Sequence, residues 1–203
     1  TQIEFVDIAG LVRGASRGEG LGNQFLAHIR EVDAVLHLLR CFEGGDVSHV
    51  EGTIDPLRDA DIVETELMLA DLESLERRRE GLIKRVRGNE AEAKAELELA
   101  DQALALLREG RPARALLDEG ADAESVRRLN LLTAKPVLYV CNVVEAEAAA
   151  GNAHSRAVAA RAKAEGAGSV VISAAIEAEL AHLSPHDREA FLGRFDPSLR
   201  LTF

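Results

Sequence analysis

The sequence is poor in aromatic residues and in cysteine. Its 203 residues include six phenylalanines, one tyrosine and no tryptophan, so its core must be built from leucine, valine, isoleucine and alanine. Its two cysteines, Cys41 and Cys141, are a hundred positions apart. That spacing fits neither a disulfide framework nor a zinc site, and it favours a reducing cytoplasmic environment.

Long hydrophobic runs and an excess of basic residues are also absent. No run approaches the roughly 18 apolar residues of a membrane span, and the start TQIEFVDIAG has no basic leader region. The net charge of −11 argues against general coating of nucleic acid. With 47% hydrophobic and 29% charged residues, the composition predicts a soluble globular protein without a membrane partner.

Short apolar runs rich in β-branched residues predict the strands. They are Ile3–Val6, Ala34–Leu39, Val137–Val140 and Ser169–Ile172. Helical stretches at Leu21–Arg30 and Ser155–Glu165 separate them. This alternation predicts an α/β fold with a parallel sheet, flanking helices and strands buried on both faces.

Residues 56–131 have a different pattern, with almost no strand signal. Apolar residues recur there at steps of three and four on either side of the turn Arg87-Gly88-Asn89. We predict an antiparallel helical hairpin with coiled-coil packing, inserted into an α/β domain formed by 1–55 and 132–203. The alternative is that these helices lie flat on the main sheet.

The carboxyl ends of the predicted strands fall at Asp7, Arg40, Asn142 and Ser173, and ligands of open parallel sheets bind at such ends. Asp7 begins the motif D-x-x-G, which ends at Gly10. An aspartate there can hold Mg²⁺ through water, and the Gly10 amide can approach a terminal phosphate without steric hindrance. A plain turn would use the same residues.

A second motif, Asn142-Val143-Val144-Glu145, follows the strand that ends near Cys141. Many GTPases have N-K-x-D at this place, where the aspartate binds guanine through two hydrogen bonds. Val143 and Glu145 replace the lysine and the aspartate, and the longer carboxylate favours adenine. The alternative is a surface turn. Ser173 and Ala174 follow the last strand, where GTPases place a main-chain N–H near the base.

Four blocks of sequence together resemble the YchF subfamily of Obg-like P-loop NTPases. They are FVDIAGLVRGASRGEGLGNQFLAHIRE, HLLRCFEGGDVSHVEGTIDPLRD, LNLLTAKPVLYVCNVVE and VVISAAIEAELAHL. The resemblance implies a nucleotide-binding domain interrupted by a helical hairpin. It also implies Mg²⁺-dependent hydrolysis of ATP, with GTP as the alternative substrate, and an association with ribosomes and translation in the cytoplasm.

The resemblance also bears on the catalytic residues. It places Leu11 where many GTPases carry a glutamine that orients water, so hydrolysis should be slow. His49, in the polar stretch GGDVSHVEG, is our candidate substitute, because an imidazole can orient or polarise water. A surface histidine without a catalytic role is the alternative.

Two parts of the family pattern are missing. The residues contain no G-x-x-x-x-G-K-[ST] phosphate-binding loop, which the family carries near its N-terminus, and no C-terminal TGS domain. We therefore expect the sequence to be part of a longer protein, with reduced phosphate affinity in this part alone.

A basic cluster surrounds the predicted hairpin turn. It comprises Arg77, Arg78, Arg79, Lys84, Arg85 and Arg87. Such a cluster could bind ribosomal RNA, although a charged helix surface is more often simply solvated. Two functions follow from the sequence: an ATPase associated with translation, or a docking module for ribosomes or proteins in which nucleotide only sets the shape.

Overall fold

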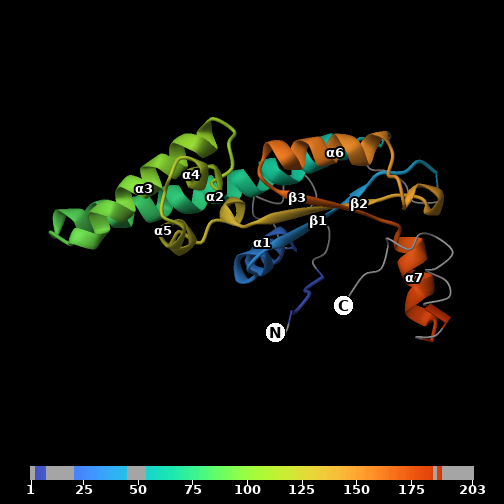
Figure 1. The fold of residues 1–203 in the computed structure, drawn as a ribbon. Coiled ribbons are helices and arrows are strands. Elements are labelled where there is room, and N and C mark those ends of the chain that lie inside the picture. Colours follow the sequence, from blue (N-terminus) through green and yellow to red (C-terminus); the bar gives the residue numbers. More distant parts are fainter. Residues whose placement is uncertain (1–2, 8–20, 45–53, 185–186, 189–203) are drawn as a thin grey trace. The chain divides into compact units, whose positions relative to one another are not determined.

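The computed structural model describes residues 3–7, 21–44, 54–184 and 187–188, and it has an α/β fold (Figure 1). Contacts between residues divide the chain into two compact units. Unit 1 comprises Thr1–Val35 and Asp61–Pro136, and unit 2 comprises Leu36–Ala60 and Val137–Phe203.

A sheet of three strands organises unit 2. The strands are β1 (Val35–Arg40), β2 (Val137–Asn142) and β3 (Gly168–Ile172), in the spatial order β1-β2-β3. β2 and β3 are parallel, with Leu138 opposite Gly168 and Asn142 opposite Ile172. Beyond the end of β1, the amide of Cys41 donates to the carbonyl of Asn142 at 2.8 Å. The three corresponding strand predictions are confirmed, and the carboxyl ends meet at one edge of the sheet.

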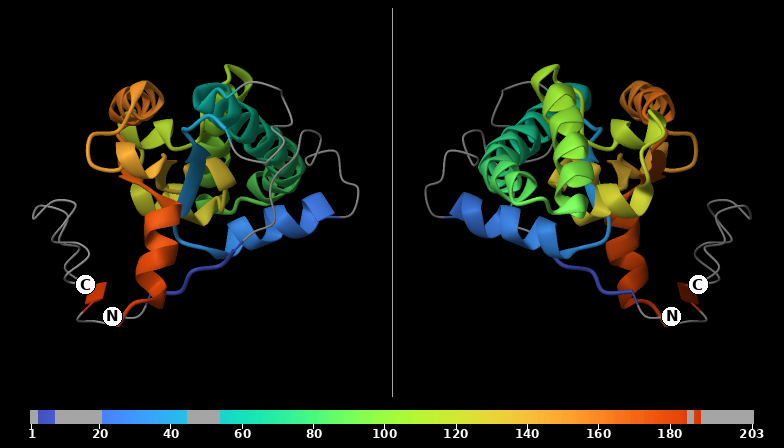
Figure 2. Two further views of the ribbon diagram at one scale, coloured as in Figure 1. Left: turned by 90° about the vertical axis from the view of Figure 1, so that its right-hand side faces the viewer. Right: turned by 90° about the vertical axis from the view of Figure 1, so that its left-hand side faces the viewer.

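One face of this sheet carries the core of unit 2. The helix α6 (Ala153–Ala164) lies along that face in Figure 1 and is seen nearly end-on in Figure 2. Tyr139 and Cys141 of β2 pack there against Val158 and Ala162 of α6. Alternate strand residues point to this face, as the two-residue period of a strand requires.

The opposite face departs from the prediction that the strands are buried on both sides. Leu36 and Leu38 of β1 are 51% and 60% exposed, and Leu138 and Val170 are also exposed. No helix in the described ranges buries these side chains.

The predicted strand Ile3–Val6 is wrong in this structure. Residues 3–7 have no regular secondary structure, and Phe5 is 76% exposed. A strand is stable only when its main-chain groups pair with a neighbouring strand. No such partner pairs with these residues among the ranges that the structure describes.

After residue 20, the regular elements described in unit 1 are mainly helices. They are α1 (Leu21–Glu31), most of α2 (Pro56–Arg87), α3 (Ala91–Arg108), α4 (Ala115–Asp118), α5 (Ala123–Arg128) and the 3-10 helix η2 (Leu132–Ala134). In unit 2, α7 (Ala174–His182) and the 3-10 helix η3 (Glu145–Glu147) complete the order. No helix in the described ranges is long and apolar enough to cross a bilayer.

The ends of α2 follow from local chemistry. Pro56 occupies its first position, and the carboxylate of Asp55 accepts a hydrogen bond from the amide of Arg58 at 3.1 Å. At the other end, Asn89 adopts a φ of 64°, and α3 begins two residues later. The predicted turn at residues 87–89 is therefore confirmed.

Leucine and alanine fill the core between α2 and α3. Leu75 and Leu82 of α2 are buried together with Ala100, Ala103 and Leu104 of α3. The leucines of both helices and the small alanines of α3 together fill this core. This packing agrees with the composition, which excludes a core rich in aromatic residues.

A buried carboxylate joins α2 to η2. Asp71 is fully buried and accepts hydrogen bonds from the amides of Leu132 and Thr133 and from the Thr133 hydroxyl, each at 2.8 Å. A guanidinium nitrogen of Arg30 lies 4.0 Å from it. Burial raises the pKa of Asp71, and the three hydrogen bonds act in the opposite direction.

Candidate functional site

A pocket of about 380 Å³ lies in unit 2 at the carboxyl ends of β1 and β2. It is lined by Phe42, Asn142, Val143, Val144, Glu145, Ala146 and Ala175. Ligands of parallel α/β sheets bind at this edge. The predicted residues Asn142, Val143 and Glu145 line the pocket, whereas Ser173 and Ala174 do not and only the following Ala175 does. The pocket is open to solvent, and its lining is largely apolar with few polar groups.

The structure brings together two motifs that are separated in sequence. The side-chain oxygen of Asn142 accepts a hydrogen bond from the amide of Ala174 at 2.9 Å. Ser173 is buried, and its hydroxyl has no hydrogen-bond partner among the described atoms. Asn142 therefore fixes the start of α7 beside the segment that follows β2.

The two valines of the second motif have different environments. Val143 is 2% exposed and packs into the core of unit 2, while its amide donates to the carbonyl of Ile172 at 2.9 Å. Val144 is 41% exposed and also lines the pocket. Val144 thus supplies the accessible apolar surface of this segment. Because side chains alternate between the two sides of an extended chain, the sequence could have indicated that Val144 is exposed where Val143 is buried.

Glu145 begins η3, where the chain turns away from the end of β2. Its side chain is exposed, and the residue lines the pocket together with Ala146. A carboxylate in this position can accept hydrogen bonds from a ligand at the pocket mouth.

Phe42 is a lining residue that the sequence motifs did not identify. Nε of Arg40 donates to the Phe42 carbonyl at 3.3 Å, and another guanidinium nitrogen donates to the carbonyl of Gly44. The Arg40 guanidinium also lies over the Phe42 ring, 4.8 Å from its centroid. Gly44 has a φ of 89°, a conformation that favours glycine. Arg40, which the strand-end argument did identify, thus supports the segment that carries Phe42.

Of the residues predicted to bind phosphate and metal, the structure describes only Asp7. This residue is exposed, follows the irregular segment 3–6 and belongs to unit 1. Gly10, Leu11 and His49 lie outside the described residues. Within the described ranges, no three His, Cys, Asp or Glu side chains come together to hold a metal ion. The described residues do not form a complete magnesium site by themselves, and the role of Asp7 stays a prediction.

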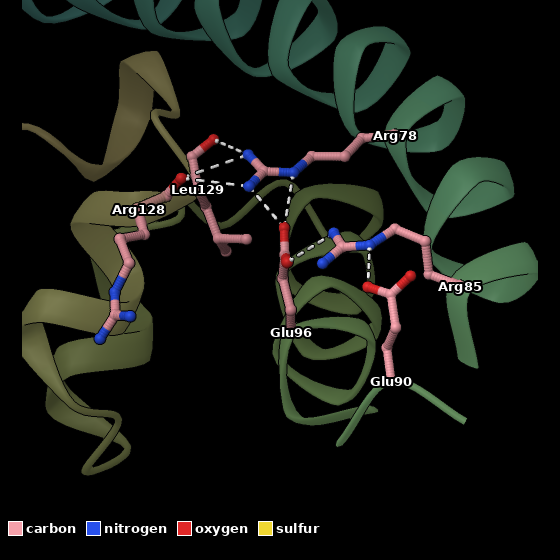
Figure 3. Close-up of polar contacts among 6 residues, drawn as sticks. All are labelled: Arg78, Arg85, Glu90, Glu96, Arg128 and Leu129. Carbon is pink, nitrogen blue, oxygen red and sulfur yellow. Dashed lines mark hydrogen bonds and ion pairs between the residues drawn. The ribbon is translucent and has the colours of Figure 1, made fainter. Parts of the chain in front are cut away.

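The predicted basic cluster lies in unit 1, where most of its members have acidic partners. Figure 3 shows Arg78 pointing toward Glu96 of α3 and toward the main chain at the end of α5. Its guanidinium donates to Glu96 at 2.5 and 2.9 Å and to the carbonyls of Arg128 and Leu129. Arg85 forms ion pairs with Glu90 and Glu96 in the same view.

Two further arginines are also paired. Arg77 contacts Glu73 at 2.6 Å, and Arg79 contacts Asp101 at 2.5 Å. Lys84 and Arg87 are exposed and have no ion-pair partner among the described residues. The positive charge that remains available at this end of α2 is therefore smaller than the sequence indicates.

The fold agrees with comparisons to known proteins. The family model described as 50S ribosome-binding GTPase matches residues 1–69. A solved structure, the YchF GTPase of Schizosaccharomyces pombe, superposes with a TM-score of 0.74 at 32% identity, covering 92% of this chain and 52% of that chain. These findings define the class, which is the Obg-like P-loop NTPases.

Curated relatives narrow this class to one family. The chain is 46% identical over 192 residues to the ribosome-binding ATPase YchF of Haemophilus influenzae, covering 95% of this chain and 53% of that protein. Identity to the ribosome-binding ATPase YchF of Bacillus subtilis is 40% over 194 residues, with the same coverage. The chain belongs to the YchF family, and it spans about half the length of the curated relatives that it matches.

Proposed function

We propose that the pocket of unit 2 binds the adenine base of ATP, and that the whole protein hydrolyses ATP in association with ribosomes in the cytoplasm. The observation that carries this proposal is the hydrogen bond from the Ala174 amide to Asn142. It holds the segment of Asn142 and Glu145 beside the start of α7, so that Asn142, Glu145 and Ala175 line one pocket.

The lining supports a planar heterocycle as ligand. Phe42 and Val144 offer an aromatic ring and an exposed apolar side chain, which suit the two faces of a base. Glu145 stands where an aspartate would bind guanine, and its longer side chain places the carboxylate differently. The curated relatives are named ATPases and the solved relative is named a GTPase, and a titration distinguishes the two bases.

The proposal assigns the hydrolytic side to the first motif. Asp7 would hold Mg²⁺ through water, the Gly10 amide would face the γ-phosphate, and His49 would orient the attacking water in place of a glutamine at Leu11. A bound Mg²⁺ would neutralise charge on the phosphates. Asp7→Ala should abolish most Mg²⁺-dependent ATP turnover of the full-length protein; unchanged turnover would remove Asp7 from this role.

Titration of the full-length protein with ATP and with GTP in the presence of Mg²⁺ tests the base assignment. We expect ATP to bind more tightly and Glu145→Asp to shift the preference toward GTP. Asn142→Ala should weaken both nucleotides about tenfold, because the hydrogen bond that fixes Ala174 is lost. Glu177→Asp, an exposed change of the same kind in α7, should have no effect. Unaltered preference in Glu145→Asp would contradict the assignment.

A second candidate function is ribosome docking through the hairpin, which we place in residues 56–131, with 1–55 and 132–203 forming the nucleotide-binding domain. The specific observation in its favour is that Lys84 and Arg87 remain exposed without ion-pair partners among the described residues. Cations in this state can neutralise RNA phosphates, whereas Arg78 and Arg85 are already engaged.

Co-sedimentation with ribosomes tests the docking candidate. Lys84→Glu combined with Arg87→Glu should reduce binding strongly at low salt and leave ATP affinity unchanged. Arg156→Glu combined with Lys163→Glu, a matched double reversal in α6, should leave binding intact. Equal losses in the two double variants would indicate a general effect of charge and would exclude this surface.

A further inference from the structure

The side chain of Asn152 bonds residues that adjoin two of the sequence segments lining the pocket of unit 2. Its amide nitrogen donates to the carbonyl of Cys41 at 2.6 Å and to the carboxylate of Glu147 at 2.7 Å. Its oxygen accepts a hydrogen bond from the amide of Ser155 at 2.9 Å. The three partners fix the orientation of the amide, because two are acceptors and one is a donor.

Each of the two acceptors is adjacent to a pocket residue. Cys41 precedes Phe42, and its own amide is bonded to the Asn142 carbonyl. Glu147 ends η3, which begins with Glu145, and the Glu147 amide donates to the Val144 carbonyl at 2.9 Å. The side-chain amide of Asn152 therefore bonds both the Phe42 segment and the Glu145–Glu147 segment.

Asn152 is itself held in place by packed secondary structure. Asn152 is the N-cap of α6, with a reciprocal capping box to Ser155, and α6 packs on β2 and β3 through Val158 and Ala162. Gly151 before it has a φ of 65°, and a Cβ at this position would lie 2.5 Å from the Ser155 hydroxyl oxygen. Only glycine brings the chain into this cap without distortion.

Helix capping alone does not explain asparagine at this position. Aspartate and serine cap helices about as well as asparagine, because the cap requires only an oxygen acceptor. The two hydrogen bonds to Cys41 and Glu147 require an N–H₂ group, which aspartate and serine lack. The residue type is thus explained by the contacts to the pocket segments.

We propose that Asn152 is a positioning residue, which sets the separation between Phe42 and Glu145 and thereby the affinity and selectivity for the base. This inference rests on the proposed function, since it assumes that the pocket holds the base of a nucleotide. Asn152 itself does not line the pocket, so its effect is transmitted through the two segments that it bonds.

Two substitutions that keep the helix cap test this role in the full-length protein. Asn152→Ser removes both donors without adding charge. Asn152→Asp places a carboxylate against the Cys41 carbonyl and the Glu147 carboxylate. We expect Mg²⁺-ATP to bind about tenfold more weakly in Asn152→Ser, and more weakly still in Asn152→Asp. Asp122→Ser, a substitution at the N-cap of α5, is the matched control and should leave affinity unchanged.

A double-mutant cycle with Phe42→Ala distinguishes positioning from a general loss of structure. If Asn152 acts through the Phe42 segment, the double variant Phe42→Ala/Asn152→Ser should lose less ATP affinity than the product of the fold-losses in the two single variants. Adding Glu147→Gln to Asn152→Asp should recover part of the affinity, because the glutamine amide can donate to the new carboxylate.

The possible failures are separable. Absence of ATP and GTP binding in the unmodified protein would overturn the proposed function. Normal ATP binding combined with unchanged affinity in Asn152→Ser, or with fully multiplicative losses in the cycle, would overturn only the positioning role.

Discussion

The two units of the molecule are stabilised by different kinds of polar contact. In unit 1, α2 and α3 are joined by ion pairs such as Arg79–Asp101 and Arg108–Glu76, whose side chains are between 42% and 59% exposed. In unit 2, the pocket segments are fixed mainly by side-chain amides and main-chain groups, as at Asn142 and Asn152, with charged groups also taking part at Arg40 and Glu147.

This difference has a physical consequence. Exposed ion pairs contribute little individually and weaken with salt, since water and counterions screen them. Hydrogen bonds between neutral groups are insensitive to salt and strongly directional. We therefore expect the geometry of the pocket to be more resistant to ionic conditions than the contacts between α2 and α3.

The largest expected effect concerns a contact of unit 1 that departs from this pattern. Asp71→Ala would leave the buried amides of Leu132 and Thr133 without acceptors. We expect a loss of about 4 kcal/mol in the free energy of unfolding, measured by urea denaturation. Asp118→Ala, in an exposed position of α4, should change it by less than about 0.5 kcal/mol. Similar losses in both variants would show that Asp71 is not a principal contact.

The next effect concerns the pH dependence of unit 2. Burial lowers the pKa of His37 to about 4, with Arg161 acting in the same direction and Asp59 and Glu165 opposing it. The unfolded chain then binds the proton more readily than the folded chain. This contribution to stability is complete above pH 6.5 and is lost as the pH falls toward about 4.

The decrease in the free energy of unfolding caused by His37 should reach at most about 3 kcal/mol. The measurement is the unfolding free energy between pH 7 and pH 4 for the unmodified protein and for His37→Gln, and the variant should show a shallower decrease. His28→Gln, at an exposed position of α1, should retain the original slope. Parallel curves for His37→Gln and the unmodified protein would refute this contribution.

A third prediction compares two glycines of unit 2. Gly151 and Gly166 have nearly equal φ values of 65° and 66°, but only at Gly151 would a Cβ meet other atoms within 4 Å. Gly166→Ala should cost about 1 kcal/mol through backbone strain, and Gly151→Ala about 2 to 3 kcal/mol because it also displaces Ser155. Thermal unfolding measures both, and equal shifts would mean that the capping segment adapts without cost.

The smallest effect is expected at the surface of unit 1. A double-mutant cycle on Arg79 and Asp101 should give a weak coupling at low salt that disappears near 1 M salt, where charges are screened within about 3 Å. The corresponding cycle on Asn142 and Phe42, read out by ATP affinity, should be unaffected by salt after correction for the phosphates. A salt-resistant coupling at Arg79 would contradict the contrast between the units.

Much of the secondary structure could be predicted because it depends on local periodicity. The apolar runs at residues 34–39, 137–140 and 169–172 matched β1, β2 and β3, and Gly88-Asn89 marked the end of α2. The run at residues 3–6 failed, since strand formation also requires a partner strand that periodicity does not reveal.

The candidate site was predictable in part for the same reason. Asn142 ends β2 and Ser173 follows β3, so both could be placed at the sheet edge from the apolar runs before them. The roles of Phe42 and Asn152 depend on contacts between residues far apart in sequence, such as the bond from Asn152 to the Cys41 carbonyl. In the basic cluster, the positive charges were evident from the sequence, but their ion-pair partners Glu96 and Asp101 were not.

The sequence by itself determined the alternation of strands and helices, the low aromatic content of the core and the motif residues Asn142 and Glu145. These properties depend on residue type and on neighbours within a few positions. Only the tertiary structure decided which side chains line the pocket, which arginines are already paired and why an asparagine precedes α6. Those outcomes depend on distances between residues that folding brings together, and on which hydrogen-bond donors find acceptors once water is excluded.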